Sequence, residues 1–321
     1  MKRTILTFVI AIATAVIAQA QQISVVSPQG ATQIYSDLNL AIQGASAGST
    51  LYLSGGGFQV NDSSTISKQL TIIGVGHRAD NDNADGSTTI GGNIRFIQGA
   101  DNSALMGVHL TGNVNIANGD GVVNAILVRF CNVNAIVIGH ANCQNILINQ
   151  NYIRNTSDGG NSAITFTNNI LHSIQRVSGG IIDHNLVRYG TLGYYVFQGV
   201  DNSQIKNNIL VDPGARLSAF NCIISNNMLL NRTWEDNSIE VEDWDDVFVG
   251  AWSGININDN YALKGTQGKN AGTDGTDIGI YGGTGFSDAA LPPGPRIVSK
   301  KIADQTDSNG NLQIEIQVSA Q

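Results

Sequence analysis

The chain has 321 residues and a formal net charge of -8, with only 13% of its residues charged, so its acidity is diffuse. It has no basic patch and no run of Arg or Lys, which argues against a nucleic-acid partner. Its 37 Gly and only 5 Pro favour many short strands joined by tight turns over helices.

The first 20 residues have the pattern of a secretory signal peptide. Lys2 and Arg3 precede an apolar run from Ile5 to Ile17, and Ala18-Gln19-Ala20 predicts cleavage before Gln21. Cleavage would change the formal charge to -8 - 2 = -10. Because no longer apolar run follows, we expect no membrane span and a secreted, periplasmic or cell-surface protein.

The segment from Ile34 to Gly76 predicts the start of the folded body. Asp37–Ala45 is expected to form a short helix, with Asp37 as its N-cap, that covers one end of the core. Residues 21–49 would then be an N-terminal cap. The first strands are expected around Thr50–Leu53, Ser64–Ile66 and Leu70–Ile73.

A phrase of apolar, polar and Asn residues recurs through residues 50–263 at intervals near twenty residues, which is typical of a solenoid. Its last turn residue falls at Thr111, Cys131, Asn151, Asn169, Asn185, Asn208, Asn227 and Asn260. At this bend an Asn tolerates left-handed backbone angles and can bond to its stacked copy. The cysteines Cys131, Cys143 and Cys222 are interpreted as buried free thiols, although one disulfide is possible.

Apolar residues keep constant offsets from this turn. Three positions earlier, the residues expected to stack inside are Val108, Val128, Ile148, Phe166, Ile182, Ile205, Ile224 and Ile257. Two positions later come Val133, Ile153, Leu171, Val187, Leu210 and Leu229. Because one coil cannot bury its own apolar face, neighbouring coils must supply the core. The fold class predicted is all-β: a single-stranded, right-handed parallel β-helix.

Residues 264–321 are expected to close the fold. Leu312, Ile314, Ile316 and Val318 alternate with polar residues and predict a terminal strand. With Ile297–Ile302, this strand is expected to form a hairpin that covers the last coil, because the unpaired strand edges of an open coil would bind other chains.

Two passages carry a family resemblance. Ile34–Gly76 resembles the N-terminal segment of the pectate-lyase-like superfamily of right-handed parallel β-helix proteins. Tyr261–Gly283, followed by Leu291–Ile297, resembles the closing segment of secreted β-helix proteins of the Bacteroidetes type. The resemblance implies the fold, export, and a polysaccharide ligand on an outer sheet face, while most of that group has no assigned activity.

One outward column of side chains is the first candidate site. One residue after the inward apolar position lie His109, Arg129, Asn149, Thr167, Asp183, Lys206, Ser225 and Asn258. Arg129, Asp183 and Lys206 are the candidate catalytic residues, whereas His109 and Asn149 are candidates for substrate binding. The alternative is a solvated sheet face, which must be polar somewhere.

Two loops are further candidates. Asp243, Asp245 and Asp246 could bind Ca²⁺ or supply a carboxylate pair, beside tryptophans that could stack on sugars. The alternative is an exposed acidic loop whose tryptophans cover the side of the helix. In the insertion after Asn185, the residues Arg188, Tyr194 and Tyr195 offer a cation and aromatic surface, or else a side-packed loop.

No complete catalytic motif of the β-helix polygalacturonases or pectate lyases is present. We therefore predict an exported, monomeric protein that binds a polysaccharide without turning it over. Two alternatives remain open: a polysaccharide lyase or glycoside hydrolase with an unfamiliar site, and a structural adhesin or spacer. Fold alone does not decide among them.

Overall fold

The computed structural model describes residues 21–61, 64–78, 86–119, 121–188, 195–212, 215–231, 233–234, 237–252, 254–294 and 296–319. The predicted signal peptide and Tyr194 lie outside the described residues. Within these ranges, no helix is both long and apolar enough to cross a membrane.

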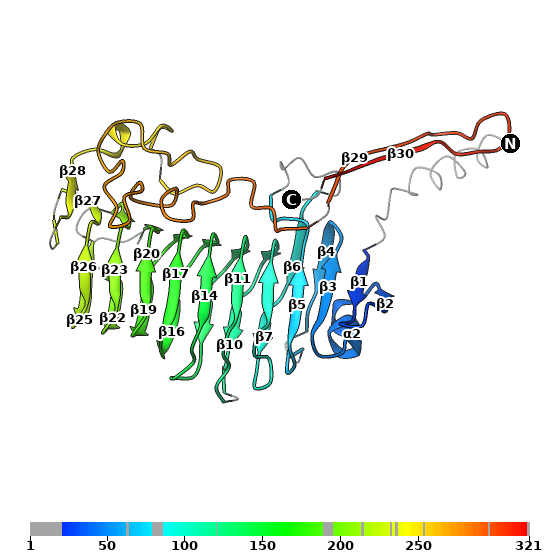
Figure 1. Ribbon diagram of the computed structural model, residues 1–321, viewed down its shortest axis with the longest axis horizontal. Helices are drawn as coiled ribbons and strands as arrows, with labels where there is room; N and C mark the ends of the chain where they lie inside the picture. Colours follow the sequence, from blue (N-terminus) through cyan, green and yellow to red (C-terminus); the bar gives the residue numbers. More distant parts are fainter. Residues whose placement is uncertain are drawn as a thin grey trace, which may run out of the picture.

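The protein is a parallel β-solenoid of about 8 turns, so the predicted β-helix is confirmed (Figure 1). Three stacks of strands, here called sheets A, B and C, run along its length. Sheet A contains β1 (Ile23–Val26), β2 (Thr32–Tyr35), β3 (Ser49–Leu53), β5 (Leu70–Ile73), β8 (Ala104–Met106), β11 (Leu127–Arg129), β14 (Ile146–Asn149), β17 (Ile164–Thr167), β20 (Ile181–Asp183), β23 (Gln204–Lys206) and β26 (Ile223–Ser225).

The other two sheets complete each coil. Sheet B contains β4 (Gly56–Gln59), β6 (Thr88–Gly91), β9 (His109–Leu110), β12 (Asn132–Val133), β15 (Tyr152–Ile153), β18 (Ile170–Leu171), β21 (Leu186–Val187), β24 (Ile209–Leu210), β27 (Met228–Leu230) and β28 (Ile239–Val241). Sheet C contains β7 (Ile94–Phe96), β10 (Val114–Ile116), β13 (Ile136–Ile138), β16 (Ser157–Ser162), β19 (Ile174–Ser178), β22 (Tyr195–Asp201) and β25 (Arg216–Phe220).

The predicted cap helix is present as α2 (Leu38–Gly44). Asp37 caps it, because its Oδ1 accepts a hydrogen bond from the Leu40 amide at 2.9 Å. Its buried residues Leu38, Ala41 and Ile42 belong to the main core. The helix therefore buries apolar surface at the N-terminal end of the solenoid.

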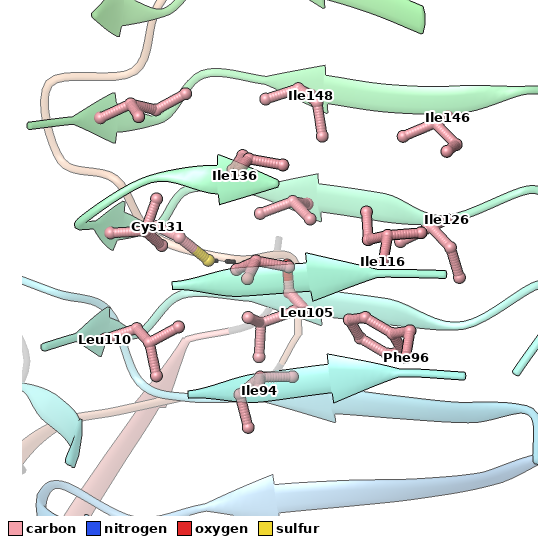
Figure 2. Packing of buried hydrophobic residues seen from close by; sticks show 14 of the residues in the cluster. Ile94, Phe96, Leu105, Leu110, Ile116, Ile126, Cys131, Ile136, Ile146 and Ile148 are labelled. Carbon is pink, nitrogen blue, oxygen red and sulfur yellow. Dashed lines mark hydrogen bonds between the residues drawn. The ribbon is translucent and has the colours of Figure 1, made fainter. Parts of the chain in front are cut away.

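Side chains from all three sheets meet in one interior. Figure 2 shows Ile94 of sheet C, Leu105 of sheet A and Leu110 of sheet B pointing into it. In sheet A, the inward stack predicted from Val128 to Ile224 is confirmed by the strand register. The stack predicted from Val133 to Leu229 in sheet B is confirmed in the same way.

The predicted register is wrong for the coil before β11. Val128 pairs with Leu105, whereas Val108 stands one residue before His109, the partner of Asn132, and so aligns with Cys131. The predicted alignment is shifted by three residues, because Leu105 and Val108 are both apolar and both fully buried and the pattern fits either one. Ile257 and Asn260 lie after β28, the last strand of the solenoid, and are not part of the stacks.

The repeated Asn residues form a buried ladder of hydrogen bonds. Asn151, Asn169, Asn185, Asn208 and Asn227 are all 0% exposed. Each of the first four donates its backbone amide and its Nδ2 to the Oδ1 of the next, at distances of 2.9–3.1 Å. Each Nδ2 also donates to a backbone carbonyl of the preceding coil, for example Asn169 to Ile148 at 2.8 Å. Burial of these amides is therefore matched by partners.

The sequence pattern predicted a left-handed backbone angle at the ladder residue itself, and this prediction is wrong. The angle belongs to the residue just before it, for example Gln150 (φ 56°), Asn168 (φ 53°) and Asn207 (φ 55°). The bend at this residue turns the following amide side chain into the stack. All three cysteine thiols are free. At the first step of the ladder Cys131 takes the place of Asn, and its Sγ donates to the Arg129 carbonyl at 3.2 Å.

The chain from residue 264 to residue 294 runs back along the solenoid over the corner between sheets A and B (Figure 1). The left-handed corner residues hold it. Asn168 Nδ2 donates to the carbonyls of Ile280 and Gly282 at 2.9 and 2.7 Å. Gln150 Oε1 accepts from the Ser287 amide at 2.9 Å. The corner thus carries two rows of polar residues, one bonded inward and one bonded to this closing segment.

A tightly packed glycine tests this attachment. A Cβ added at Gly282 would collide with the Asp277 carbonyl and lie 2.5 Å from Nδ1 of the buried His184. We expect Gly282→Ala to loosen the closing segment and to raise its rate of limited proteolysis about tenfold. Gly265→Ala is the control, since its added Cβ meets only Gln267 N at 3.9 Å. Equal cleavage of both variants would contradict the predicted contact.

The predicted terminal hairpin is present as β29 (Arg296–Ile302) and β30 (Ile314–Ser319), which pair antiparallel. It does not cover the last coil. Figure 1 shows it near the N-terminal strands, extending past them along the long axis of the solenoid. The reason is that the closing segment has already carried the chain back along the whole body.

Candidate functional site

The strands of sheet A place most of the predicted outward column in register. The aligned residues are Arg129, Asn149, Thr167, Asp183, Lys206 and Ser225. His109 and Asn258 are not part of it, which corrects the prediction. His109 lies in sheet B, where it pairs with Asn132. Asn258 lies beyond the coils, where its Oδ1 accepts from Arg78 at 3.1 Å.

The three candidate catalytic residues are not brought together. Lys206 Nζ lies 3.8 Å from Asp183 Oδ2, and Asp183 Oδ1 also accepts from Asn207 Nδ2 at 2.8 Å. Arg129 is three coils away from Asp183, which at about 4.8 Å per coil is about 14 Å. Asp183 and Lys206 therefore satisfy each other, and Arg129 cannot act on the same atom.

Arg129 and Asn149 are held by their own surroundings. The Arg129 guanidinium carbon lies 4.4 Å from the centre of the Phe130 ring, and its Nε is buried without a hydrogen-bond partner among the described residues. Burial lowers the pKa of Arg129. Asn149 is 5% exposed and donates to the Thr167 carbonyl at 3.2 Å. Asn149 is therefore engaged within the sheet, while the Arg129 guanidinium is held against the Phe130 ring.

The acidic loop holds itself together. Asp243 caps a 3-10 turn, η1 (Trp244–Asp246), by accepting from the Asp245 amide at 2.9 Å. Asp245 Oδ1 accepts from the Trp252 amide at 2.7 Å. In the part of the chain that the structure describes, no group of three or more His, Cys, Asp or Glu is placed to hold a metal ion.

Two tryptophans of this loop, Trp244 and Trp252, cover sheet B, whereas Trp234 packs against Phe197 of sheet C. Trp244 is 1% exposed, stacks on Phe248 with 5.3 Å between ring centres, and donates to the Val211 carbonyl at 2.9 Å. Trp244 and Phe248 form a second apolar cluster with Ile278 and Ile280. This cluster packs against the outward residues of sheet B, which are Ile170, Leu186, Ile209 and Met228. Trp244 is thus unavailable to stack on a sugar.

The third candidate group is divided between two sheets. Arg188 directly follows β21 of sheet B, whereas Tyr195 opens β22 of sheet C and pairs with Arg216. Tyr195 is 40% exposed, and Tyr194 lies outside the described residues. Arg188 and Tyr195 therefore belong to different faces.

A basic pocket lies beside the covered part of sheet B, and of its basic residues only Arg188 was predicted from the sequence. Arg154, His172 and Arg188 are each the third residue after a ladder residue (Asn151, Asn169 and Asn185), so they stand on three successive coils. They line a cavity of about 110 Å³ together with Tyr152, Ile170 and Ile255. Reading the sequence three positions beyond the ladder would have found this column.

Arg154 is held by the coils before it. Its Nη1 lies 2.9 Å from His109 Nε2, and its Nη2 donates to the carbonyls of Leu110 and Thr111 at 3.0 and 3.3 Å. No ion pair found among the described residues includes Arg154. Its orientation is thus fixed by neutral groups, and none of the described carboxylates forms an ion pair with it. His109, a predicted binding residue, therefore supports this pocket from the side.

Arg188 completes the pocket from the next coil but one. Its Nε lies 4.0 Å from Asp212 Oδ1, at the limit of an ion pair. Gly254 has φ +109°, and a Cβ added there would lie 3.2 Å from Arg188 Nη1. The loop that carries Ile255 therefore approaches the guanidinium closely and forms one wall of the pocket.

The two histidines beside these arginines are held neutral. Burial, supported by Arg188, lowers the pKa of His172 below its usual value of 6.5. Burial, supported by Arg154, lowers the pKa of His109 in the same way. Burial raises the pKa of Tyr152, and the two arginines oppose that rise. At neutral pH the pocket thus combines two guanidinium cations with neutral hydrogen-bonding groups.

These shifts predict a loss of stability in acid. The unfolded chain protonates each histidine near pH 6.5, whereas the folded chain does so only at lower pH. Because the unfolded state binds more protons in that window, the free energy of unfolding should fall as the pH drops below 6.5. Urea unfolding at pH 8 and pH 5 measures this fall, which should be smaller in His172→Gln. An equal fall in that variant would contradict the prediction.

No protein-family profile matches the chain, and no curated protein is significantly similar to it.

Proposed function

We propose that this protein is exported and binds an extended anionic polysaccharide through the basic pocket, without turning it over. The observation that supports this best is the column of Arg154, His172 and Arg188 on successive coils of a chain with a net charge of -8. Paired guanidinium groups bind carboxylate or sulfate groups with charge-assisted hydrogen bonds. The resemblance to the pectate-lyase-like superfamily of exported β-helix proteins agrees with this proposal.

The size of the pocket favours a polymer over a small ligand. Sites for small molecules usually have volumes of about 300–1,000 Å³, whereas this cavity has about 110 Å³. It therefore accommodates one charged substituent, and the rest of the ligand lies outside. Arg154 and Arg188 are two coils apart, about 10 Å at 4.8 Å per coil, so together they suit charges that repeat along a chain. Tyr152 adds an amphipathic ring at the same site.

Binding is favoured over turnover because the described residues that line the pocket include no acid. Glycoside hydrolysis commonly uses two carboxyl groups that flank the bond, and no carboxylate lines the described wall of this cavity. The Asp183–Lys206 ion pair lies on a different sheet. The alternative, a lyase or hydrolase, is tested below. The binding unit is one chain, since a single chain supplies every residue of the pocket.

The test uses the chain from Gln21 onward. Affinity electrophoresis compares polygalacturonate and alginate with neutral dextran and neutral xyloglucan, each with and without Ca²⁺. We expect retention by the anionic polymers only. Equal retention by neutral polymers, or none by any, would overturn the proposal.

The same mixtures are examined by mass spectrometry for new oligosaccharides. The proposal expects none. Unsaturated products would instead show eliminative cleavage, and products that have gained water would show hydrolysis. Either result would replace binding by the enzymatic alternative.

A further inference from the structure

A second cavity, here called the N-terminal basin, lies beside α2 at the N-terminal end of the solenoid (Figure 1). It is lined by side chains of the helix and by described residues between Asn61 and Lys68, which follow β4. Its volume is about 500 Å³, within the range of about 300–1,000 Å³ that is usual for sites of small ligands. The basin is therefore large enough for a whole sugar unit.

Hydrogen bonds join the two walls of the basin. Asn39 of the helix donates its Nδ2 to the Gln59 carbonyl at 3.2 Å, and its Oδ1 accepts from the Asn61 amide at 2.9 Å. One helical turn further on, Lys68 Nζ donates to the Gln43 carbonyl at 2.9 Å. The basin is thus formed before a ligand arrives, which reduces the ordering that binding must cost.

The lining offers neutral polar groups and one cation. Four of its polar side chains have no hydrogen-bond partner in the described part of the chain, namely those of Gln43, Asn61, Thr65 and Ser67. Amides and hydroxyls both donate and accept, as the hydroxyl groups of a sugar require. Lys68 forms no ion pair with the described carboxylates, and the described lining residues include no acid. This combination suits a sugar unit that carries one acidic group.

The basin and the basic pocket lie on the same edge of sheet B. The register aligns Gln59, at the end of β4, with Gly91, and the column continues through Thr111 and Asn134 to Arg154. The strands along this edge are β4, β6, β9, β12 and β15, so four steps of about 4.8 Å separate the two sites by about 19 Å. One extended polymer lying along this edge would reach both.

An amide side chain lies on each coil between the two sites. The Asn113 amide donates to Asn93 Oδ1 at 2.8 Å, Asn134 Nδ2 donates to Asn113 Oδ1 at 2.8 Å, and Asn155 Nδ2 donates to Asn134 Oδ1 at 2.6 Å. In contrast to the buried ladder, these four residues are half-buried or exposed. The path from the basin to the pocket therefore offers hydrogen-bonding groups to the neutral part of a sugar chain.

We propose that the N-terminal basin is a second binding site for the anionic polysaccharide and holds one of its acidic sugar units. The inference rests on the proposed function, because it takes the same polymer as the ligand. Two sites on one rigid body raise the affinity for a chain long enough to reach both, since the second contact is then intramolecular. A chain too short to span them binds each site separately.

Isothermal titration calorimetry with galacturonate oligosaccharides of defined length tests the proposal, using the chain from Gln21 onward. We expect digalacturonate, the short probe, to bind at two sites per chain. A long probe of about ten units should bind once per chain and at least about tenfold more tightly.

Variants assign the two sites. Lys68→Gln should leave one site for digalacturonate and remove the advantage of the long probe. Ser67→Glu, which adds an anion at an exposed position of the basin, should have the same effect without removing the bond from Lys68 to the helix. Lys269→Gln is the control, since it removes the same charge from an exposed residue of the closing segment. Circular dichroism of each variant verifies that it is folded.

The site that remains in each variant separates this proposal from the proposed function. A single site that is lost in Arg188→Gln and kept in Lys68→Gln would overturn the basin and leave the basic pocket. A single site with the opposite behaviour would overturn the basic pocket and leave the basin. If neither probe binds, both proposals are wrong.

Discussion

Asn185→Ala is expected to lower the free energy of unfolding by about 3–5 kcal/mol, because it removes both sides of one ladder step. Asn185 Oδ1 accepts from the amide and from Nδ2 of Asn169, both at 3.0 Å. Its Nδ2 donates to the carbonyls of Phe166 and Asp183 and to Asn208 Oδ1, at 2.9–3.0 Å. The Asn185 side chain is fully buried, so water cannot replace these bonds.

Urea unfolding of Asn185→Ala measures this effect. Asn221→Ala is the matched control, because Asn221 also lies at a turn between coils and donates to the Asn of a neighbouring coil, Asn202 Oδ1, at 2.7 Å. Its side chain is exposed, however, so the loss should be confined to the strain of Ala at the left-handed backbone of Asn221 (φ 53°), about 1 kcal/mol. If the two substitutions cost the same, the buried ladder would not be the stabilising feature inferred here.

Arg188→Gln is expected to weaken the binding of polygalacturonate by about 10- to 100-fold, the usual effect of losing hydrogen bonds to a charged group. Arg188 is the better test of the two arginines, since Arg154 also holds backbone carbonyls of earlier coils. Arg176→Gln is the control: it removes the same charge from sheet C, where Arg176 pairs with Asp158. Isothermal titration calorimetry compares the two. Equal losses would indicate general attraction by charge in place of a site.

The affinity for the polyanion should also depend on pH. The pKa of His172 lies below 6.5, so the side chain is neutral at pH 7 and becomes a third cation of the pocket only in acid. A bound anion favours that cation, and affinity should therefore rise as the pH falls below 6.5 while the polymer remains ionised. The rise should be smaller in His172→Gln, where His109 still titrates beside Arg154. A rise of equal size in that variant would place the titration elsewhere.

The repeat determined the coil and much of its interior. An apolar residue three positions before the ladder and another two positions after it can be buried only by neighbours with the same pattern, so the stacks from Val128 to Ile224 and from Val133 to Leu229 follow from spacing. The N-cap of α2 followed from Asp37 for a similarly local reason. Local periodicity and capping act within one or two coils, where sequence separation translates directly into position.

Only the tertiary structure decided which polar residues meet. Arg154, His172 and Arg188 are 16 to 18 residues apart in sequence (154, 172, 188), and they form a pocket because a loop more than 60 residues later brings Ile255 against them. In the same way, the closing segment binds the outer corner at Asn168. It places the β29–β30 hairpin at the N-terminal end, far from the last coil, which the hairpin was expected to cover. Alternation from Leu312 to Val318 predicted the terminal strand of this hairpin, but where the hairpin lies depended on the path of the closing segment. Such long-range packing depends on the shape of the whole solenoid, which no short pattern contains.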